Sequence, residues 1–135
     1  MIQRIQTIHL LCSAIIGIIA IILNIKNPIL SFQNEEVSAF HYINLIFILI
    51  STIISIWSIF LYTNRLKQIR FVNISICFQI LNYLVIILCI FTSLIQEQWG
   101  SITFYLPLIS IIFNLLARKR ILFDERLVRS ADRLR

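Results

Sequence analysis

Charged residues are scarce in this chain of 135 residues. Lys and Arg number 12 and Asp and Glu number 6, so 13% of the sequence is charged, against about 25% in an ordinary soluble domain. Hydrophobic residues make up 59%. Thirteen of the charged side chains lie in residues 63–70 and 118–135, which leaves long uncharged tracts elsewhere. This composition excludes a soluble globular domain, and the length suits one unit of a few membrane spans.

Motifs that carry common enzyme chemistry are also absent. The sequence contains no Cys-x-x-Cys, no Gly-rich phosphate loop and no Gly-x-Ser-x-Gly. Its three cysteines, Cys12, Cys77 and Cys89, lie inside apolar segments, and their odd number argues against a disulfide framework. We therefore expect that the protein is not an enzyme.

Ligands for a metal or a haem are sparse. His9 and Cys12 share one helix face, but no carboxylate or second histidine accompanies them at that depth. His41 falls at the opposite membrane edge, so the two histidines are not placed to ligate one haem. The apolar segments contain no Asp, Glu, Lys or Arg, which coupled transporters usually need at depth. We expect no metal, no cofactor and no coupled transport.

Four apolar segments can be distinguished, at about 5–25, 42–62, 71–95 and 101–117. Each is close to the roughly 20 residues that cross the hydrocarbon layer as a helix. No small-x-small cleavage site follows the first segment, so we expect a retained span and not a signal peptide. The sequence predicts an all-α fold, an integral membrane four-helix bundle over residues 1–117. A basic, cytoplasmic, amphipathic tail follows over residues 118–135.

The basic residues predict the orientation of the bundle. With four spans, 11 of the 12 Lys and Arg residues lie on one side, and Lys26 lies on the other. Because positive connections stay in the cytoplasm, both termini and residues 63–70 are expected inside, at the bacterial inner membrane. Trp99, in an outer connection, is placed as an interfacial anchor. The net charge of +6 then reports orientation, and no nucleic-acid partner is expected.

Small and polar residues recur in every segment with a spacing of i, i+4, i+7, which places them on one helix face. The four stripes are Ser13, Gly17 and Ala20; Ser51, Ser55 and Ser58; Ser75, Gln79 and Asn82; and Ser110, Asn114 and Ala117. Helices in lipid associate through close packing and hydrogen bonds. We therefore expect the stripes to face one another as a helix-packing polar seam.

The second and third segments are expected to form an antiparallel hairpin, so the depths of their polar residues in the membrane can be compared. We count from their inner ends, at Tyr62 and Phe71. Three pairs then lie at similar depth: Ser58 with Ser75, Ser55 within one residue of Gln79, and Ser51 with Asn82. The favoured interpretation is a structural hydrogen-bonded seam, and the alternative is a binding or conduction site at Gln79 and Asn82. Pro107, in the fourth segment, is expected to kink its helix.

The tail has the pattern of an amphipathic helix. Phe123, Leu127, Ala131 and Leu134 share an arc of about 80°. Charged residues occupy the opposite side, at spacings that allow ion pairs. We expect the tail to contact the membrane surface or a protein partner. The residues expected in this interaction are Phe123, Leu127, Arg129, Ala131, Asp132 and Leu134.

The two ends of the chain carry a resemblance to a known family. The opening MIQRIQT and the closing LVRSADRLR, which Asp124 and Glu125 precede, resemble an uncharacterised family of small bacterial membrane proteins. This family is of the domain-of-unknown-function type and is found in the Bacteroidetes. The resemblance implies a four-span inner-membrane protein of unknown role. It assigns no catalytic or ligand-binding residue.

Two functions from different classes fit these features. The leading hypothesis is a structural or accessory subunit, or an assembly factor, that acts through its cytoplasmic face. Its partners would be membrane lipids and either another protein or a second copy of this chain. The alternative is an oligomeric channel or carrier for an uncharged or lipid-like molecule, and a membrane enzyme ranks third. A stable partner in mild detergent would favour the first, and solute flux in vesicles the second.

Overall fold

The computed structural model describes residues 2–26, 35–91 and 102–133. These residues form four α-helices and no strand: α1 (Ile2–Lys26), α2 (Glu35–Phe60), α3 (Arg65–Phe91) and α4 (Ile102–Arg133). The prediction of an all-helical fold with four helices is confirmed for this part of the chain. Trp99, with the rest of 92–101, lies outside the described residues.

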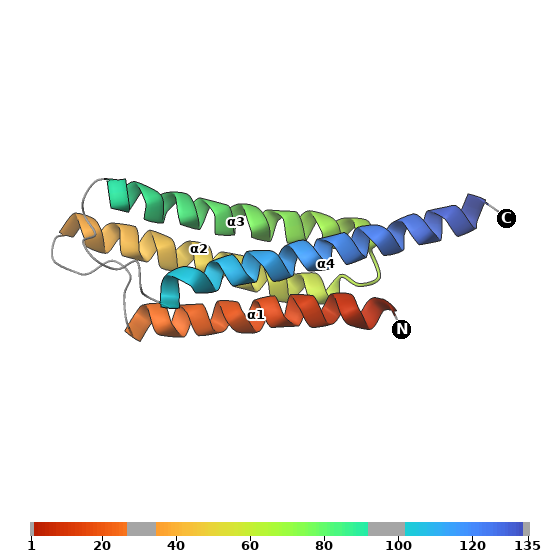
Figure 1. Ribbon diagram of the computed structural model, residues 1–135, viewed down its shortest axis with the longest axis horizontal. Coiled ribbons are helices and arrows are strands. Elements are labelled where there is room, and N and C mark those ends of the chain that lie inside the picture. The colour runs from red at the N-terminus through yellow and green to blue at the C-terminus, as the bar shows by residue number, and fades with distance from the viewer. Residues whose placement is uncertain (1, 27–34, 92–101, 134–135) are drawn as a thin grey trace.

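The helices pack as an up-and-down bundle (Figure 1). Successive helices run antiparallel, and α1 and α3 each contact both α2 and α4. The N-terminal end of α1, the turn between α2 and α3, and the C-terminal end of α4 lie at the same end of the bundle. We call this the basic end, because the described Arg and Lys side chains other than Lys26 lie on the helix segments found there.

The outer surface of the bundle is apolar and much of its interior is polar, the reverse of a water-soluble bundle. Large hydrophobic side chains such as Ile53 and Ile112 are more than half exposed, whereas Ser75, Asn82 and Asn114 are fully buried. Three described helical segments are long and apolar enough to cross a membrane: Ile5–Lys26, His41–Phe60 and Arg65–Leu88. The surface of the bundle therefore suits lipid.

The turn between α2 and α3 is tighter than the sequence suggested. α3 begins at Arg65, well before Phe71, and α2 ends at Phe60. The Asn64 carbonyl accepts a 2.9 Å hydrogen bond from the Gln68 amide, and this bond closes the first turn of α3. The basic stretch 65–70 is thus helical and not a loop, because Lys and Arg are good helix formers where a helix meets water.

α4 runs without interruption from the apolar fourth segment through the basic residues to Arg133. Pro107 lies inside it and is buried. The next amide, that of Leu108, donates a 2.9 Å hydrogen bond to the Tyr83 hydroxyl on α3. A backbone donor beside the proline is therefore satisfied by a neighbouring helix.

Close approach and apolar packing hold the bundle at two levels. On α1, a methyl group at Gly17 would overlap the Thr52 hydroxyl and lie 3.1 Å from the Thr52 methyl carbon, so only glycine permits this approach of α1 to α2. Nearer the basic end, an apolar layer closes the interior. Its buried members are Leu10, Val72, Ile76, Ala117 and Ile121.

Candidate functional site

The centre of the bundle holds a hydrogen-bonded network of serine and amide side chains. The hydroxyls of Ser55 on α2 and Ser75 on α3 lie 2.8 Å apart. Ser75 Oγ also donates to the Ser51 carbonyl at 3.0 Å. From α4, Asn114 Nδ2 reaches Ser55 Oγ at 3.4 Å, Ser75 Oγ at 3.3 Å and Gln79 Oε1 at 3.5 Å. Asn114 therefore ties α4 to the α2–α3 hairpin.

The same network reaches α1 through Ser110. Gln79 Nε2 donates to Ser110 Oγ at 2.8 Å, and Ser110 Oγ lies 2.9 Å from Ser13 Oγ. The polar contacts of Gln79 therefore run to α4 and not to α2. All four helices contribute to this network, which fixes their relative heights in the bundle.

A layer of three asparagines lies farther from the basic end. Asn24 Nδ2 on α1 donates to Asn44 Oδ1 on α2 at 3.0 Å, and Asn82 Nδ2 on α3 donates to the Asn44 carbonyl at 3.0 Å. All three side chains are at most 1% exposed. The layer joins three helices and makes a second polar contact level.

The eight polar residues that α2, α3 and α4 contribute to the predicted seam are all buried, and none is more than 4% exposed. Three of their serines also use helix carbonyls as acceptors: Ser51 Oγ donates to Ile48 and Ser58 Oγ to Ser55, within their own helix, while Ser75 Oγ donates across to Ser51. Such back-bonding satisfies a hydroxyl in an apolar environment.

The register of the α2–α3 hairpin differs from the expected one. Ser55 lies opposite Ser75 and not Gln79, and Asn82 lies opposite Asn44 and not Ser51. The expected register assumed inner ends at Tyr62 and Phe71. Because the helices meet through the short turn 61–64, each α2 residue faces an α3 residue about one turn closer to the start of α3.

Several buried polar residues were not singled out from the sequence. They extend the four stripes by about one more helical repeat: Gln6 and Asn24 on α1, Asn44 on α2, Gln68 on α3 and Asp124 on α4. Each lies four or seven residues from a residue of the stripe on its own helix, which places it on the same helix face. The same periodicity, followed further along each segment, could have found them.

The interior contains little free space. A cavity of about 10 Å³ lies between the central network and the asparagine layer, lined by Gly17, Ala20, Ile48, Ser51, Gln79, Asn82, Pro107 and Ser110. It can hold about one water molecule. Asn82 Oδ1 is buried with no hydrogen-bond partner, which makes it a possible acceptor for such a water. The apolar layer separates this cavity from the basic end.

Polar groups reappear beyond the apolar layer, at the basic end. Gln68 Nε2 donates to the Ser58 carbonyl at 3.1 Å, and Arg65 Nη1 donates to the Asp124 carbonyl at 3.1 Å. The Asp124 side chain is 4% exposed, and neither carboxylate oxygen has a hydrogen-bond partner among the described residues. Arg65 thus holds the main chain of α4 against the α2–α3 turn.

The predicted tail interaction can be examined for two of its residues. Phe123 is 53% exposed and Leu127 is 45% exposed. Arg129, Ala131 and Asp132 lie within α4, but their side chains are outside the described residues, as is the whole of Leu134. These two large apolar side chains lie on the outer side of α4, away from the buried Ile121 and Asp124, and farther along α4 extends beyond the other three helices (Figure 1).

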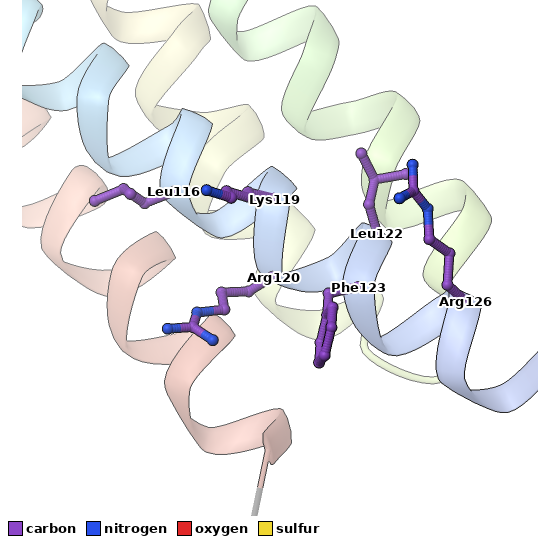
Figure 2. A pocket seen from close by; sticks show the side chains of 6 residues that line it. All are labelled: Leu116, Lys119, Arg120, Leu122, Phe123 and Arg126. Carbon is purple, nitrogen blue, oxygen red and sulfur yellow. The ribbon is translucent and has the colours of Figure 1, made fainter.

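The outer face of α4 at the basic end carries a groove of about 380 Å³ (Figure 2). Its lining residues are Leu116, Lys119, Arg120, Leu122, Phe123 and Arg126. This face lies opposite the face that packs into the bundle through Ala117, Ile121 and Asp124. We call it the basic groove.

No group of three or more His, Cys, Asp or Glu residues that could hold a metal ion is found in the described part of the chain. His9 and Cys12 both lie on α1, where the His9 ring packs near the Phe113 ring at a centroid distance of 6.2 Å. Cys12 is half-buried and Cys77 is exposed on the outside of the bundle, and both are free thiols. The side chain of Cys89 lies outside the described residues.

A comparison with protein families identifies the family to which the chain belongs. Residues 2–134 match the family described as "Domain of unknown function (DUF4293)", so the chain belongs to this family. The expected membership in an uncharacterised family is thereby confirmed. No curated protein and no solved structure matches the chain.

Proposed function

We propose that this member of an uncharacterised family is a multi-pass protein of the bacterial inner membrane that presents the end of α4 to a cytoplasmic protein partner. The observation that best supports this proposal is the continuity of α4. The helix is anchored inside the bundle through Ser110 and Asn114 and continues unbroken to Arg133, beyond the other helices (Figure 1). A rigid helix fixed at one end holds its exposed residues at a defined distance from the membrane.

Four membrane spans are part of this proposal. If α1, α2 and α3 cross the bilayer, α4 must lie at the same depth, because Ser110 and Asn114 bond to Ser13, Ser55 and Ser75 within the apolar segments of these helices. Prolines such as Pro107 are tolerated in membrane helices. The positive charge of the basic end supports a cytoplasmic location for both termini.

The contents of the bundle support an anchoring role more than a conducting one. The interior is filled by hydrogen-bonded side chains, and its cavity of about 10 Å³ stands apart from the basic end behind Leu10, Val72 and Ile121. A pore through one copy would have to break this packing. The channel or carrier hypothesis therefore requires a path between several copies. We also propose that the protein is not an enzyme, since the buried polar residues are engaged in helix contacts.

The exposed apolar residues at the end of α4 are the proposed contact surface. Phe123 and Leu127 are exposed on the outer side of α4, whose inner side packs against the bundle at Ile121 and Asp124. Burying one large apolar side chain at an interface contributes about 1.5 to 3 kcal/mol. A partner protein or a second copy of this chain could cover them.

Affinity capture from membranes in mild detergent tests this role. The tagged full-length chain should retain a specific protein that Leu127→Asp loses and that Lys67→Gln, at an exposed position on α3, retains. Both substitutions lower the net charge by one, so the second controls for charge. Loss of the partner from both variants would indicate an electrostatic association instead. Capture of no partner, together with solute flux in vesicles that contain only this chain, would favour the channel or carrier.

A further inference from the structure

The basic groove combines cationic and apolar side chains within a short stretch of α4. Three of its six lining residues are basic, namely Lys119, Arg120 and Arg126, and the other three are apolar. In Figure 2, Arg120 and Phe123 extend toward the α1 side, while the ends of Lys119 and Arg126 are directed back toward Leu116 and Leu122. The cationic groups therefore lie beside apolar surface and not in a separate patch.

No acidic side chain lines this groove, and among the described residues none of the three basic groups donates to a carboxylate. Arg65, by comparison, donates to the Asp124 carbonyl. The groove thus holds three exposed positive charges. An anionic ligand would gain attraction there without displacing an existing ion pair.

The groove also lies where the surface of α4 changes from apolar to charged. Ile112, Leu115 and Leu116 are exposed on the side nearer the centre of the bundle, and Arg118, Lys119 and Arg120 follow at once. In a membrane helix this change marks the boundary between hydrocarbon and headgroups. A ligand at this level must satisfy a cationic site and an apolar surface together, as an anionic lipid does.

We propose that the basic groove binds an anionic phospholipid of the cytoplasmic leaflet. Lys119, Arg120 and Arg126 contact the phosphate and the headgroup, and the Leu116 side chain lies along the start of an acyl chain. The groove volume is within the usual range for small-ligand sites. The proposal rests on α4 crossing the membrane as proposed above, and it adds a defined lipid site to the general attraction between basic residues and anionic membranes.

Lipid binding to the purified full-length chain tests this site. The chain in a neutral detergent is titrated with phosphatidylglycerol, phosphatidylcholine and inorganic phosphate, and bound lipid is counted by native mass spectrometry. One phosphatidylglycerol per chain should bind at least about fivefold more tightly than phosphatidylcholine, and millimolar phosphate should not displace it. Arg120→Gln should weaken binding about fivefold, the effect of one basic side chain at a headgroup, and Arg120→Gln with Arg126→Gln about thirtyfold.

Arg118→Gln provides the matched control. Arg118 belongs to the same exposed cluster and carries the same charge, but it does not line the groove. Binding to Arg118→Gln should change less than twofold. Equal losses in Arg118→Gln and Arg120→Gln would show diffuse attraction without a site, and equal binding of the two lipids or displacement by phosphate would also overturn the proposal. Circular dichroism of each variant verifies its fold. These measurements involve no protein partner, so their failure leaves the docking role of α4 open.

Discussion

The hydroxyl groups of Ser55 and Ser75 lie 2.8 Å apart at the centre of the bundle, where α2 and α3 face each other. Asn114 of α4 reaches both hydroxyls with one amide nitrogen. This contact sets the register of the hairpin and the height of α4 against it. Since α4 carries the exposed groups at the basic end, the position of those groups depends on this buried contact.

The register can be tested by cross-linking in the membrane. Cysteines at positions 55 and 75, in a chain whose three native cysteines are replaced, should form a disulfide readily under mild oxidation, because hydroxyls in contact imply side chains within disulfide reach. A pair at 55 and 79 should react much more slowly. The outward pair at 53 and 80 serves as the control, since Ile53 and Ile80 are exposed on the outer surface. Faster reaction of the 55–79 pair would contradict the observed register.

Asn114 should be the most sensitive polar residue of the central network. Asn114→Ala removes the donor that joins α4 to Ser55, Ser75 and Gln79. We expect a loss of about 1 kcal/mol of unfolding free energy, since hydrogen bonds between membrane helices are worth about that much. Denaturant titration in detergent micelles measures it. Asn73→Ala is the control, because Asn73 is half-buried and outside this network. Equal losses in both variants would argue against the network.

The approach of α1 to α2 should depend on Gly17. Gly17→Ala places a methyl group against the Thr52 side chain, and overpacking of this kind costs about 1 to 3 kcal/mol. Thermal unfolding should therefore occur at a lower temperature. Adding Thr52→Ala removes the hydroxyl and methyl groups in the way and should restore most of the lost stability. A double variant no more stable than Gly17→Ala would show that this contact is not the cause.

The carboxyl group of Asp124 should destabilise the bundle. It is buried, and neither oxygen has a described hydrogen-bond partner, so an ionised group there would lose its hydration without gaining a hydrogen bond in exchange. Asp124→Asn has nearly the same shape and removes the charge. The Asp124→Asn substitution should raise the unfolding midpoint. Glu125→Asn, at a half-buried neighbouring position, serves as the comparison. A lower midpoint for Asp124→Asn alone would mean that the carboxylate is paired in the membrane.

The helical character of the chain and the inward face of each helix follow from local sequence patterns. Uncharged tracts of about 20 residues require helices in lipid. The repeated small and polar residues identify the face of each helix that points into the bundle. Periodicity carries this information because hydrogen bonding inside a bundle selects the same positions in every turn.

Register and long-range contacts needed the folded structure. The charges of Arg65, Lys67 and Arg70 suggested a loop, whereas these residues form the first turns of α3, and the error shifted every expected α2–α3 pair by about one turn. The contacts of Arg65 with Asp124 and of Ser13 with Ser110 join residues far apart in the chain. Periodicity within one helix does not predict such contacts, because they depend on how α4 packs against the other helices.

The most direct test of the account is the sidedness of α4 in the membrane. Single cysteines at Ser31, between α1 and α2, and at Ser130, on the extension of α4, are placed in the full-length chain without its native cysteines. A membrane-impermeant maleimide is then added to spheroplasts and to inverted vesicles. Cysteine 31 should react in spheroplasts and cysteine 130 in inverted vesicles, because the bundle crosses the membrane and keeps the C-terminal extension of α4 in the cytoplasm. Reaction of both cysteines from the same side would contradict the account.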